Sequence, residues 1–455
     1  MRKIIIILFV FVFSFNFLSQ DIYANSAQKY WSGSKGTTIL VAEENSPIIV
    51  TQEDLIFNIY DFPINHYDFN GSQNYEANFK AIYQFKNTAD YDVSAKLYFP
   101  LGHLPSYLGS DNYLNSPEVF NNYKISVNGE EVDSNIRYTH SPRFVEFNIT
   151  KDINLINDDY IESFFKEDTK VKEIIYQVSE YDKEKYPAAD AAISFKLDEN
   201  KNRVLLENQS GFDLREEKGI LTTWVDKEAF SLFIFGEDLD ELPNFEVYKD
   251  GSRKEKIDVN IDVVDIKEYS FKEFIEAQYG NRASISFVDY YNAKVNLYDQ
   301  MSVNGFILNE NLSEFEKDLM PWFEYEIQIG ANESISNEVC ASLYPDINEH
   351  YVPAIYNYHY LLSPASTWKE FNNLNIQINT DKYLNTSSLE LVKNENGYSY
   401  SSQELPDTEL EFSLSDSENP QVESGPYNYF YGIIAMIVIV FIAIIFIIKH
   451  KKKNK

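Results

Sequence analysis

Cysteine is almost absent from this chain of 455 residues, because Cys340 is the only one. No disulfide can therefore form within the chain, and its stability has to come from packed cores. Cys340 lies in the stretch NEVCASLYP, whose alternation predicts a strand. A buried apolar position is the ordinary place for a single cysteine, and a catalytic thiol would need a histidine partner.

Motifs that carry enzyme or cofactor chemistry are also absent. The chain contains no nucleophile elbow, no Walker loop, no H-E-x-x-H, no glycine-rich dinucleotide loop and no EF-hand spacing. His350 and His359 are nine residues apart, which favours solvent-facing strand positions over metal ligands. We therefore predict no catalytic residue, no cofactor or cofactor-binding residue, and no metal ligand.

Basic residues are scarce relative to acidic ones. The chain has 39 Lys and Arg against 71 Asp and Glu, and its formal net charge is −32. A surface with this acidic excess repels nucleic-acid phosphates and anionic lipid head groups, so we predict no nucleic-acid partner. The more common role of such a charge is to keep a protein soluble.

The first 24 residues have the pattern of a secretory signal peptide. Arg2 and Lys3 precede an apolar stretch from Ile4 to Leu18, and Ala24 or Ser26 supplies a small residue for the signal peptidase. The apolar stretch of about 15 residues is shorter than the roughly 20 residues that span a bilayer. We expect residues 1–24 to be cleaved and the remaining chain to be exported.

The C-terminal end has the pattern of a membrane anchor. Residues 430–448 carry no charge, and a helix of that length covers roughly 28 Å, near the thickness of the hydrocarbon layer. The lysines among residues 449–455 follow at once, and the positive-inside rule leaves them in the cytoplasm. We predict a single-pass type I protein of the cell membrane, whose C-terminal helix contacts the membrane and whose ectodomain lies outside the cytoplasm.

The stretch LPDTE, from Leu405 to Glu409, is one residue short of the LPxTG motif that sortases cut. Sortase needs a small residue where Glu409 stands, and its motif normally abuts the span. Here the predicted strand ELEFSLS continues from the motif instead. We therefore interpret LPDTE as a loop that enters the last strand.

Alternating β-branched and aromatic residues predict an N-terminal β-sandwich over residues 46–150. In residues 75–102, two alternating runs are joined by KNTADYD, which predicts a hairpin that ends at Pro100. A second hairpin is predicted in YKISVNGEEVDSNIRY, through a type I′ turn at Asn128 and Gly129.

The segments YQFKNTADYDVSAKLYFPLG and ISVNGEEVDSNI together resemble the pattern of vault/inter-alpha-trypsin (VIT) type β domains and related exported bacterial proteins, over about residues 75–137. In that pattern a Y-x-F-x-N strand leads to an F-P-L-P corner, and then to a strand that ends in an Asn-Gly or Asp-Gly turn. The chain departs at the corner, where Gly102 replaces the last proline. The D-x-S-x-S metal motif of the von Willebrand A domain, which often follows VIT domains, is missing. The resemblance implies a β-sandwich and supplies no active site.

Residues 151–320 are a predicted middle α+β region. Apolar residues at three-and-four spacing predict helices within residues 157–186, and strands return after Ala188. Short helices are predicted at Phe271 to Tyr279, Tyr290 to Tyr298, and Ser313 to Leu319.

Strand patterns dominate again in residues 321–415, a C-terminal β region, and residues 416–429 have the low apolar content of a stalk. Whether the N- and C-terminal β regions form one domain is left open. The predicted fold class is therefore mainly β, with β-sandwich-like domains, an inserted helical or α+β segment and one C-terminal transmembrane helix.

Tyr356, Tyr358 and Tyr360 fall on one face of a predicted strand. An exposed tyrosine row could stack on sugar rings or bind an extended peptide, whereas a buried row would pack across strands. We name these three as candidate ligand-contact residues, with a protein or a glycan as the ligand.

The function that fits this pattern best is a non-enzymatic, membrane-anchored extracytoplasmic binding or scaffolding protein. The frequent Ile, Asn, Lys and Tyr residues are typical of an AT-rich bacterial genome. Two alternatives stay open. One is an exported hydrolase whose site is assembled from distant residues, and the other is an extracytoplasmic subunit of a membrane complex.

Overall fold

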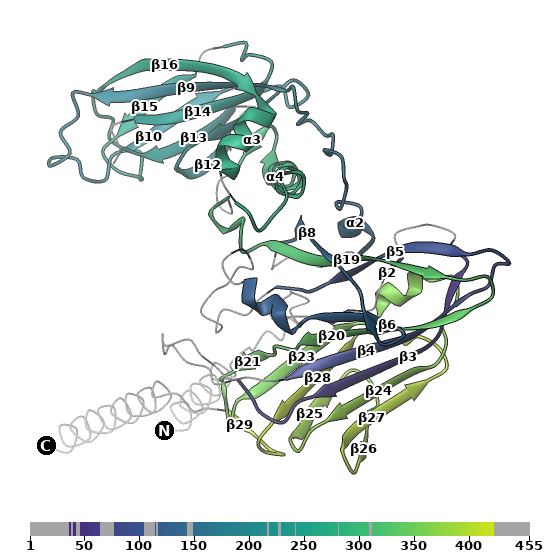
Figure 1. The fold of residues 1–455 in the computed structure, drawn as a ribbon. Helices are drawn as coiled ribbons and strands as arrows, with labels where there is room; N and C mark the ends of the chain where they lie inside the picture. Colours follow the sequence, from purple (N-terminus) through teal and green to yellow (C-terminus); the bar gives the residue numbers. More distant parts are fainter. Residues whose placement is uncertain are drawn as a thin grey trace, which may run out of the picture.

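The structure is a computed structural model, and it describes residues 36–37, 40–41, 46–63, 77–103, 114, 117–142, 149–215, 218–225, 229–241, 243–280, 282–308 and 312–422. These residues form two lobes (Figure 1). We call residues 46–141 and 319–422 the sandwich lobe, and residues 165–308 the insert lobe.

The three terminal predictions, the signal peptide (1–24), the transmembrane helix (430–448) and the basic tail (449–455), lie outside the described residues. In the part of the chain that is described, no helix combines the length and the apolar character needed to cross a bilayer.

An eight-stranded sheet forms one layer of the sandwich lobe, in the order β26-β27-β24-β3-β4-β20-β6-β7. Every second residue of its central strands is buried, which is the alternation seen in the sequence. Its strands are β3 (Ile48–Asn58), β4 (Asn78–Asn87), β6 (Lys124–Val127), β7 (Glu130–Glu131), β20 (Ser334–Ser342), β24 (Leu374–Asn379), β26 (Val392–Asn394) and β27 (Gly397–Ser402).

Two smaller sheets face this layer, in the orders β2-β5-β19-β8 and β1-β23-β28-β25, with β21 paired to β23. Phe79 of β4 stacks on Phe99 of β5, and Phe57 of β3 packs on Phe412 of β28. The bounds are β1 (Gly36–Thr37), β2 (Leu40–Val41), β5 (Val93–Pro100), β8 (Asn135–His140), β19 (Leu319–Ile329), β21 (Asp346–Asn348), β23 (Ile355–Leu361), β25 (Tyr383–Ser387) and β28 (Leu410–Ser415). The chain is therefore mainly β, as predicted.

The N- and C-terminal β regions share one sandwich. β3 pairs in parallel with β24, β4 pairs with β20, and β5 pairs with β19. The chain leaves the sandwich lobe after β8 and returns at β19, which is the direct neighbour of β8 in the same sheet. The question that the sequence left open is thus resolved in favour of one domain with a long insertion.

The hairpin predicted for residues 75–102 is wrong. β4 and β5 lie in different sheets, so the turn between them crosses from one layer to the other. Asn87 holds that turn, because its side-chain amide donates to the carbonyl of Tyr91 and to that of Ile329, at 2.7 and 3.2 Å. By contrast, the Asn128-Gly129 hairpin is present, and both residues have the positive φ (52° and 84°) of a type I′ turn.

The insert lobe has three layers (Figure 1). One sheet has the order β12-β13-β10-β15 and the next the order β16-β9-β14-β11-β18-β17, and helices α3 (Phe271–Tyr279) and α4 (Phe287–Met301) cover the latter. The strands are β9 (Lys170–Ser179), β10 (Asp190–Phe195), β11 (Asn202–Leu206), β12 (Gln209–Arg215), β13 (Lys218–Trp224), β14 (Ala229–Gly236), β15 (Asn244–Tyr248), β16 (Asn260–Ser270), β17 (Ser302–Val303) and β18 (Phe306–Ile307).

Helix α3 has the bounds predicted for it, because the chain supplies a complete capping box. The Ser270 side chain accepts from the Glu273 amide, and the Glu273 carboxylate accepts from the Ser270 amide. Helix α4 contains the predicted segment and begins earlier, after the cap Ser286. The third predicted helix is a short 3₁₀ turn, η4 (Leu312–Glu314), followed by β19.

The helices predicted within residues 157–186 are wrong. Residues 170–179 form strand β9, and no helix lies in the rest of that range. β9 carries buried residues on both of its faces. Ile174 and Tyr176 pack toward the four-stranded sheet, whereas Val171 packs toward helices α3 and α4. Apolar residues on both faces of a strand produce the irregular spacing that resembled a helix.

The remaining elements are short and lie outside the large sheets. They are α2 (Ile149–Ile153), η3 (Pro117–Asn122), η5 (Ser363–Thr367) and the pair β22 (Tyr351–Val352) and β29 (Gln421–Val422). The predicted stalk therefore has a short strand at residues 421–422. LPDTE is a loop that enters β28, and the Glu409 carboxylate accepts from the amides of Leu362 and Ser363, the latter at 3.0 Å.

Candidate functional site

The outer face of the four-stranded sheet in the insert lobe carries a hollow of about 370 Å³. Strands β10, β13 and β15 form its floor, and the chain after β15 forms one wall. The residues that line it are Ala192, Ser194, Ile220, Glu246, Tyr248, Gly251, Ser252 and Arg253.

Strand alternation explains why these residues face outward. Ile193 and Phe195 of β10 point into the core against the six-stranded sheet, so Ala192 and Ser194 point the other way. Both are small, which leaves room above the sheet. Pairing places Ile220 of β13 beside Ser194, and Glu246 of β15 beside Ala192.

Arg253 is the cation of the hollow. It has φ 52°, a left-handed conformation that is uncommon for a residue other than glycine and that turns the chain back over the sheet. Its Nε lies 3.9 Å from Oδ2 of Asp190, which is too far for a hydrogen bond. Its guanidinium makes no hydrogen bond within the described residues, so its donors remain available to a ligand.

Asp190 lies beside the hollow, at the start of β10, and is 3% exposed. Burial raises the pKa of its carboxyl, although Arg253 and the hydroxyl of Ser210 oppose that shift. Ser210 Oγ donates to Asp190 Oδ1 at 3.3 Å, and it can accept from the Thr222 hydroxyl at 3.0 Å. The ion pair between Asp190 and Arg253, at 3.9 Å, helps to hold the guanidinium over the sheet.

Glu246 is the carboxylate in the hollow itself. Its Oε2 accepts from the Tyr248 hydroxyl at 2.5 Å, and its Oε1 pairs with Lys256. The hydrogen bond from Lys256 lowers the pKa of Glu246, and the hydrogen bond to Glu246 raises the pKa of Tyr248. These contacts hold the Tyr248 ring at the wall of the hollow.

Trp224 stands at the rim and is 47% exposed. It lies opposite Asp190 on one side, and Tyr248 lies opposite Asp190 on the other. Gly251 lies close to the indole, and a Cβ added at this position would be 3.1 Å from Cη2 of Trp224. The rim thus combines an exposed indole with a tight turn.

The hollow has the chemistry of a binding site for a small polar molecule. Its described lining offers the guanidinium of Arg253, which makes an ion pair with Asp190 but no hydrogen bond, a hydroxyl at Ser194, a carboxylate at Glu246 and the ring of Tyr248. It contains neither histidine nor cysteine, so it does not pair a nucleophile with a base in the usual way.

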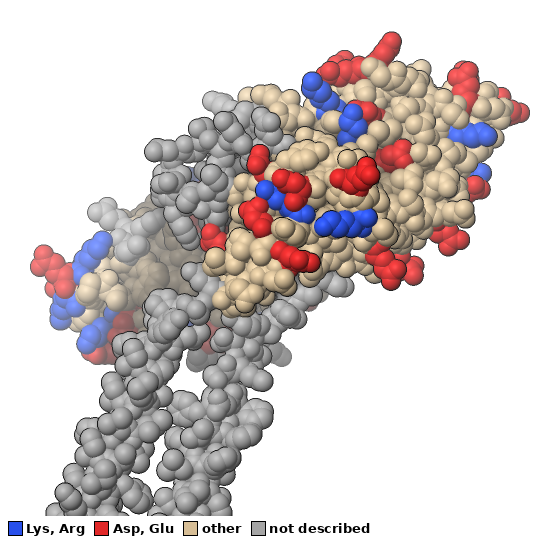
Figure 2. All heavy atoms as spheres, turned by 90° about the horizontal axis from the view of Figure 1, so that it is seen from below, with Lys and Arg blue, Asp and Glu red and all other residues tan. Residues whose placement is uncertain are grey.

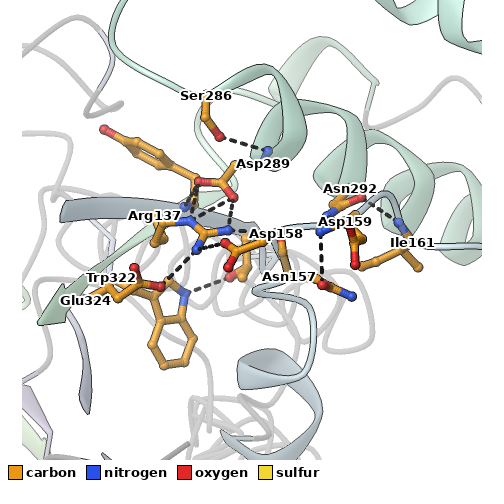
Figure 3. Close-up of polar contacts among 12 residues, drawn as sticks. Arg137, Asn157, Asp158, Asp159, Ile161, Ser286, Asp289, Asn292, Trp322 and Glu324 are labelled. Atoms are coloured by element: carbon orange, nitrogen blue, oxygen red, sulfur yellow. Dashed lines mark hydrogen bonds and ion pairs between the residues drawn. The ribbon is translucent and has the colours of Figure 1, made fainter. Parts of the chain in front are cut away.

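A second polar cluster joins the two lobes around Arg137 of β8, and Figure 3 shows it. The guanidinium donates through Nε and Nη2 to Asp289 of α4, and through Nη1 to Glu324 of β19, at 2.9–3.1 Å. It also reaches the carbonyl of Asn157 and the carboxylate of Asp158.

The centre of this cluster is buried, and the groups that contact the Arg137 guanidinium belong to this chain. The Asp289 side chain is 1% exposed and that of Arg137 is 10% exposed. Burial would lower the pKa of Arg137, but Asp289, Glu324 and Asp158 raise it above its ordinary value. Because the guanidinium is surrounded by acceptors of this chain, we assign the cluster to holding α4 on the sandwich lobe.

The candidate tyrosines from the sequence lie mainly in the core. Tyr358 is 1% exposed and Tyr360 is 0% exposed, and the Tyr360 hydroxyl lies 3.1 Å from that of Tyr83. Tyr356 is half-buried and stacks on Phe62 at 3.8 Å between ring centroids. The rings of Tyr358 and Tyr360 are therefore not on the surface, and the packing alternative describes them.

The single cysteine and the two histidines singled out in the sequence lie apart from the hollow. Cys340 is half-buried in β20, and burial raises the pKa of its thiol. His359 of β23 lies between Asp346 and Glu411. Within the described residues, no group of three or more His, Cys, Asp or Glu side chains could hold a metal ion.

The hollow was not visible in the sequence because its residues come from three strands and a turn. Ser194, Ile220 and Glu246 have no common spacing, and they meet through the strand order β13-β10-β15. The stretch YKDGSRKEK, from Tyr248 to Lys256, does carry a turn pattern at Asp250-Gly251, which could have placed Arg253 just after a turn.

Surface charge does not single out another site on the face drawn in Figure 2. Acidic side chains are spread over that face with basic side chains among them. Elsewhere, exposed lysines are paired in the same way, as when Lys170 contacts both Asp238 and Glu268. The acidic excess is therefore distributed over that face and does not gather into one patch.

No protein-family model matches the chain, and no curated protein matches it either. Among solved structures, the chain is similar to a protein from Legionella pneumophila subsp. pneumophila described as a "putative nutrient binding protein". The two share 10% sequence identity, and the match covers 84% of this chain and 71% of that one, with a TM-score of 0.28. At that score the likeness does not define a common fold.

Proposed function

We propose that the chain is a membrane-anchored extracytoplasmic binding protein and that the hollow in its insert lobe binds a carbohydrate. The observation that carries this proposal is Arg253. Its guanidinium lines the hollow and makes no hydrogen bond within the described residues, although its backbone is held in an unfavourable conformation. Strain that places an uncommitted donor group over a hollow is typical of binding sites.

The lining favours a polyhydroxylated ligand. Hydroxyl groups of a sugar both donate and accept, and the hollow offers a donor at Arg253 and an acceptor at Glu246. The apolar face of a sugar ring can lie on an aromatic ring, and Tyr248 is in the wall. A volume of about 370 Å³ is at the low end of ligand pockets, which suits one or two sugar units.

Binding is tested with the full chain in detergent against an immobilised set of neutral and acidic oligosaccharides. Arg253→Ala should weaken the binding of any retained oligosaccharide by about tenfold or more, since it removes a charged hydrogen-bond donor worth roughly 1.5–3 kcal/mol. Ser194→Leu should abolish binding, because the longer side chain fills the floor of the hollow.

Lys249→Ala is the matched control, because Lys249 is a cation of the same turn that does not line the hollow and pairs with Glu255. Its binding should equal that of the wild type. If only acidic oligosaccharides are retained, the group that contacts Arg253 is a carboxylate of the sugar. If neutral oligosaccharides are retained, that group is a hydroxyl. Failure of every oligosaccharide to bind, or equal binding by Ser194→Leu, would contradict the proposal.

We also propose that the C-terminal segment holds the protein in the membrane without sortase. Deletion of the chain from Phe430 onward should release the protein into the medium, because the uncharged residues 430–448 would be lost. Thr408→Ala should leave its location unchanged, since LPDTE enters strand β28. Cell fractionation and immunoblotting measure both results.

The two variants separate the two ways of attachment. Loss of surface attachment in Thr408→Ala would show that the motif at Leu405 is cut after all. Retention of the truncated chain in the membrane fraction would show that another part of the protein anchors it.

A further inference from the structure

Strand β16 is the free edge of the six-stranded sheet in the insert lobe (Figure 1). It has 11 residues, and it exposes three aliphatic side chains: Val263 is 52%, Val264 51% and Ile266 53% exposed. Within the described residues, no strand pairs with its outer side. A long edge with exposed aliphatic residues is a template for pairing with another strand.

One backbone amide shows which groups of β16 face outward. The amide of Ile266 donates to Oδ1 of Asp265 at 2.9 Å, so it is not used in the ladder with β9. In an antiparallel strand the amide and carbonyl of one residue point to the same side. Ile266 therefore presents both groups to the open edge, where a second strand could exchange two hydrogen bonds with it.

The charges along β16 fit a second copy of the same strand. We propose that two copies of this chain pair their β16 strands antiparallel, around a two-fold axis at Ile266. Asp265 of each copy then lies opposite the partner's Lys267, and the two Ile266 side chains contact each other. Asp265 has no cation partner within the described residues, and this pairing gives its carboxylate the partner's Lys267, which also lies 3.5 Å from Glu173 of its own chain.

Other two-fold registers are less favourable. An axis at Asp265, Lys267 or Glu268 would place two like charges directly opposite each other, which destabilises a strand pair. The register shift between Val263 and Asp265 limits regular pairing to about the residues after it. With the axis at Ile266, one register provides both the contact between the two Ile266 side chains and the two pairs of Asp265 with Lys267.

The register is tested by disulfide trapping of the full chain in membranes, in a Cys340→Ser background. Ile266→Cys should give a disulfide-linked dimer on mild oxidation, because paired residues that exchange hydrogen bonds have Cα atoms about 5.5 Å apart, within disulfide range. Val263→Cys is the matched control. It is equally exposed, but its two copies would be six residues apart along the strands, or about 20 Å, and should not link.

The second test exchanges the charges of Asp265 and Lys267. Cross-linking, and the molecular mass of the detergent-solubilised protein, then measure how much dimer remains. Asp265→Lys and Lys267→Asp should each lose the dimer, because each places like charges opposite each other. The double variant Asp265→Lys with Lys267→Asp should recover it. These side chains are on the surface, so an unchanged melting temperature will show that the fold is intact.

Three results would overturn the proposal: no dimer from Ile266→Cys, equal linking of Ile266→Cys and Val263→Cys, or a double variant that stays monomeric. Equal linking would mean that the membrane crowds the chains without pairing β16. Oligosaccharide binding at the hollow does not enter any of these measurements, so this proposal and the proposed function can fail separately.

Discussion

Arg137→Met is expected to destabilise the protein by about 3–5 kcal/mol, because it leaves the buried carboxylate of Asp289 without its cation, whereas Glu324 keeps Lys96 at 3.7 Å. The guanidinium satisfies Asp289 of α4 and Glu324 of β19, whose side chains are 1% and 10% exposed. The Asp289 carboxylate also accepts from the Tyr138 amide, which keeps it in place when Arg137 is removed. Urea unfolding of the full chain in detergent measures the change.

Asp158→Asn is the matched control for this prediction. Asp158 contacts the same guanidinium at 2.9 Å, but its side chain is 77% exposed. An exposed ion pair contributes about 0–1 kcal/mol, so this variant should unfold nearly as the wild type does. Replacing Arg137 and Asp289 together with Met and Leu should recover much of the lost stability. If Arg137→Met costs no more than Asp158→Asn, the cluster does not hold the lobes together.

Alternation predicted where strands occur but not which strands pair. In residues 75–102 it identified β4 and β5, since Phe79 and Phe99 both have to be buried. The same burial is achieved when the strands face each other across a sandwich, and their rings do stack between layers. The turn between these strands is held by Asn87, whose side chain donates to Ile329 at the end of β19, more than two hundred residues later.

The insert lobe was harder to predict because its six-stranded sheet is covered on both faces. A half-buried strand such as β4 alternates, and it was recognised. β9 has Ile174 on one buried face and Val171 on the other, so the period of two is lost. Local capping, by contrast, needs no distant residue: the capping box of Ser270 with Glu273 fixes the start of helix α3, whose bounds were predicted from the sequence.

The candidate site could not be predicted for a related reason. A hollow on a sheet depends on which strands are neighbours. Small residues such as Ala192 and Ser194 do not show in the sequence that they form its floor. Tyrosines at alternating positions were the visible feature, yet alternation itself signals burial, and Tyr358 and Tyr360 are core residues. Arg253 became a candidate only when the structure showed its guanidinium over the sheet.

His140, at the end of β8, is a second place where a buried charge would be costly. Its side chain is 1% exposed, and its ring stacks on Phe315 with 6.0 Å between centroids. Neither ring nitrogen has a hydrogen-bond partner within the described residues. Burial, and then the positive charges of Lys294 and Lys151, lower the pKa of His140 from 6.5 to about 3. The folded protein therefore keeps this imidazole neutral.

We expect this histidine to make the protein less stable in acid. Between pH 6.5 and about pH 3 the unfolded chain binds a proton at His140 that the folded chain does not, so the free energy of unfolding falls as the pH falls. At about 1.36 kcal/mol per pH unit, the loss is about 2 kcal/mol at pH 5 and about 3 kcal/mol at pH 4. The His140→Phe variant keeps the ring contact and removes the titration.

The measurement is urea unfolding of the full chain and of His140→Phe at pH 7.5, 5 and 4. At pH 7.5 the two should differ little, because the imidazole is neutral in both folded and unfolded chains. The variant should then become the more stable of the two as the pH falls, by the amounts given above. Carboxylates titrate in both proteins and cancel in the difference. A difference that stays constant from pH 7.5 to 4 would show that the folded protein accepts a proton at His140 as readily as the unfolded chain.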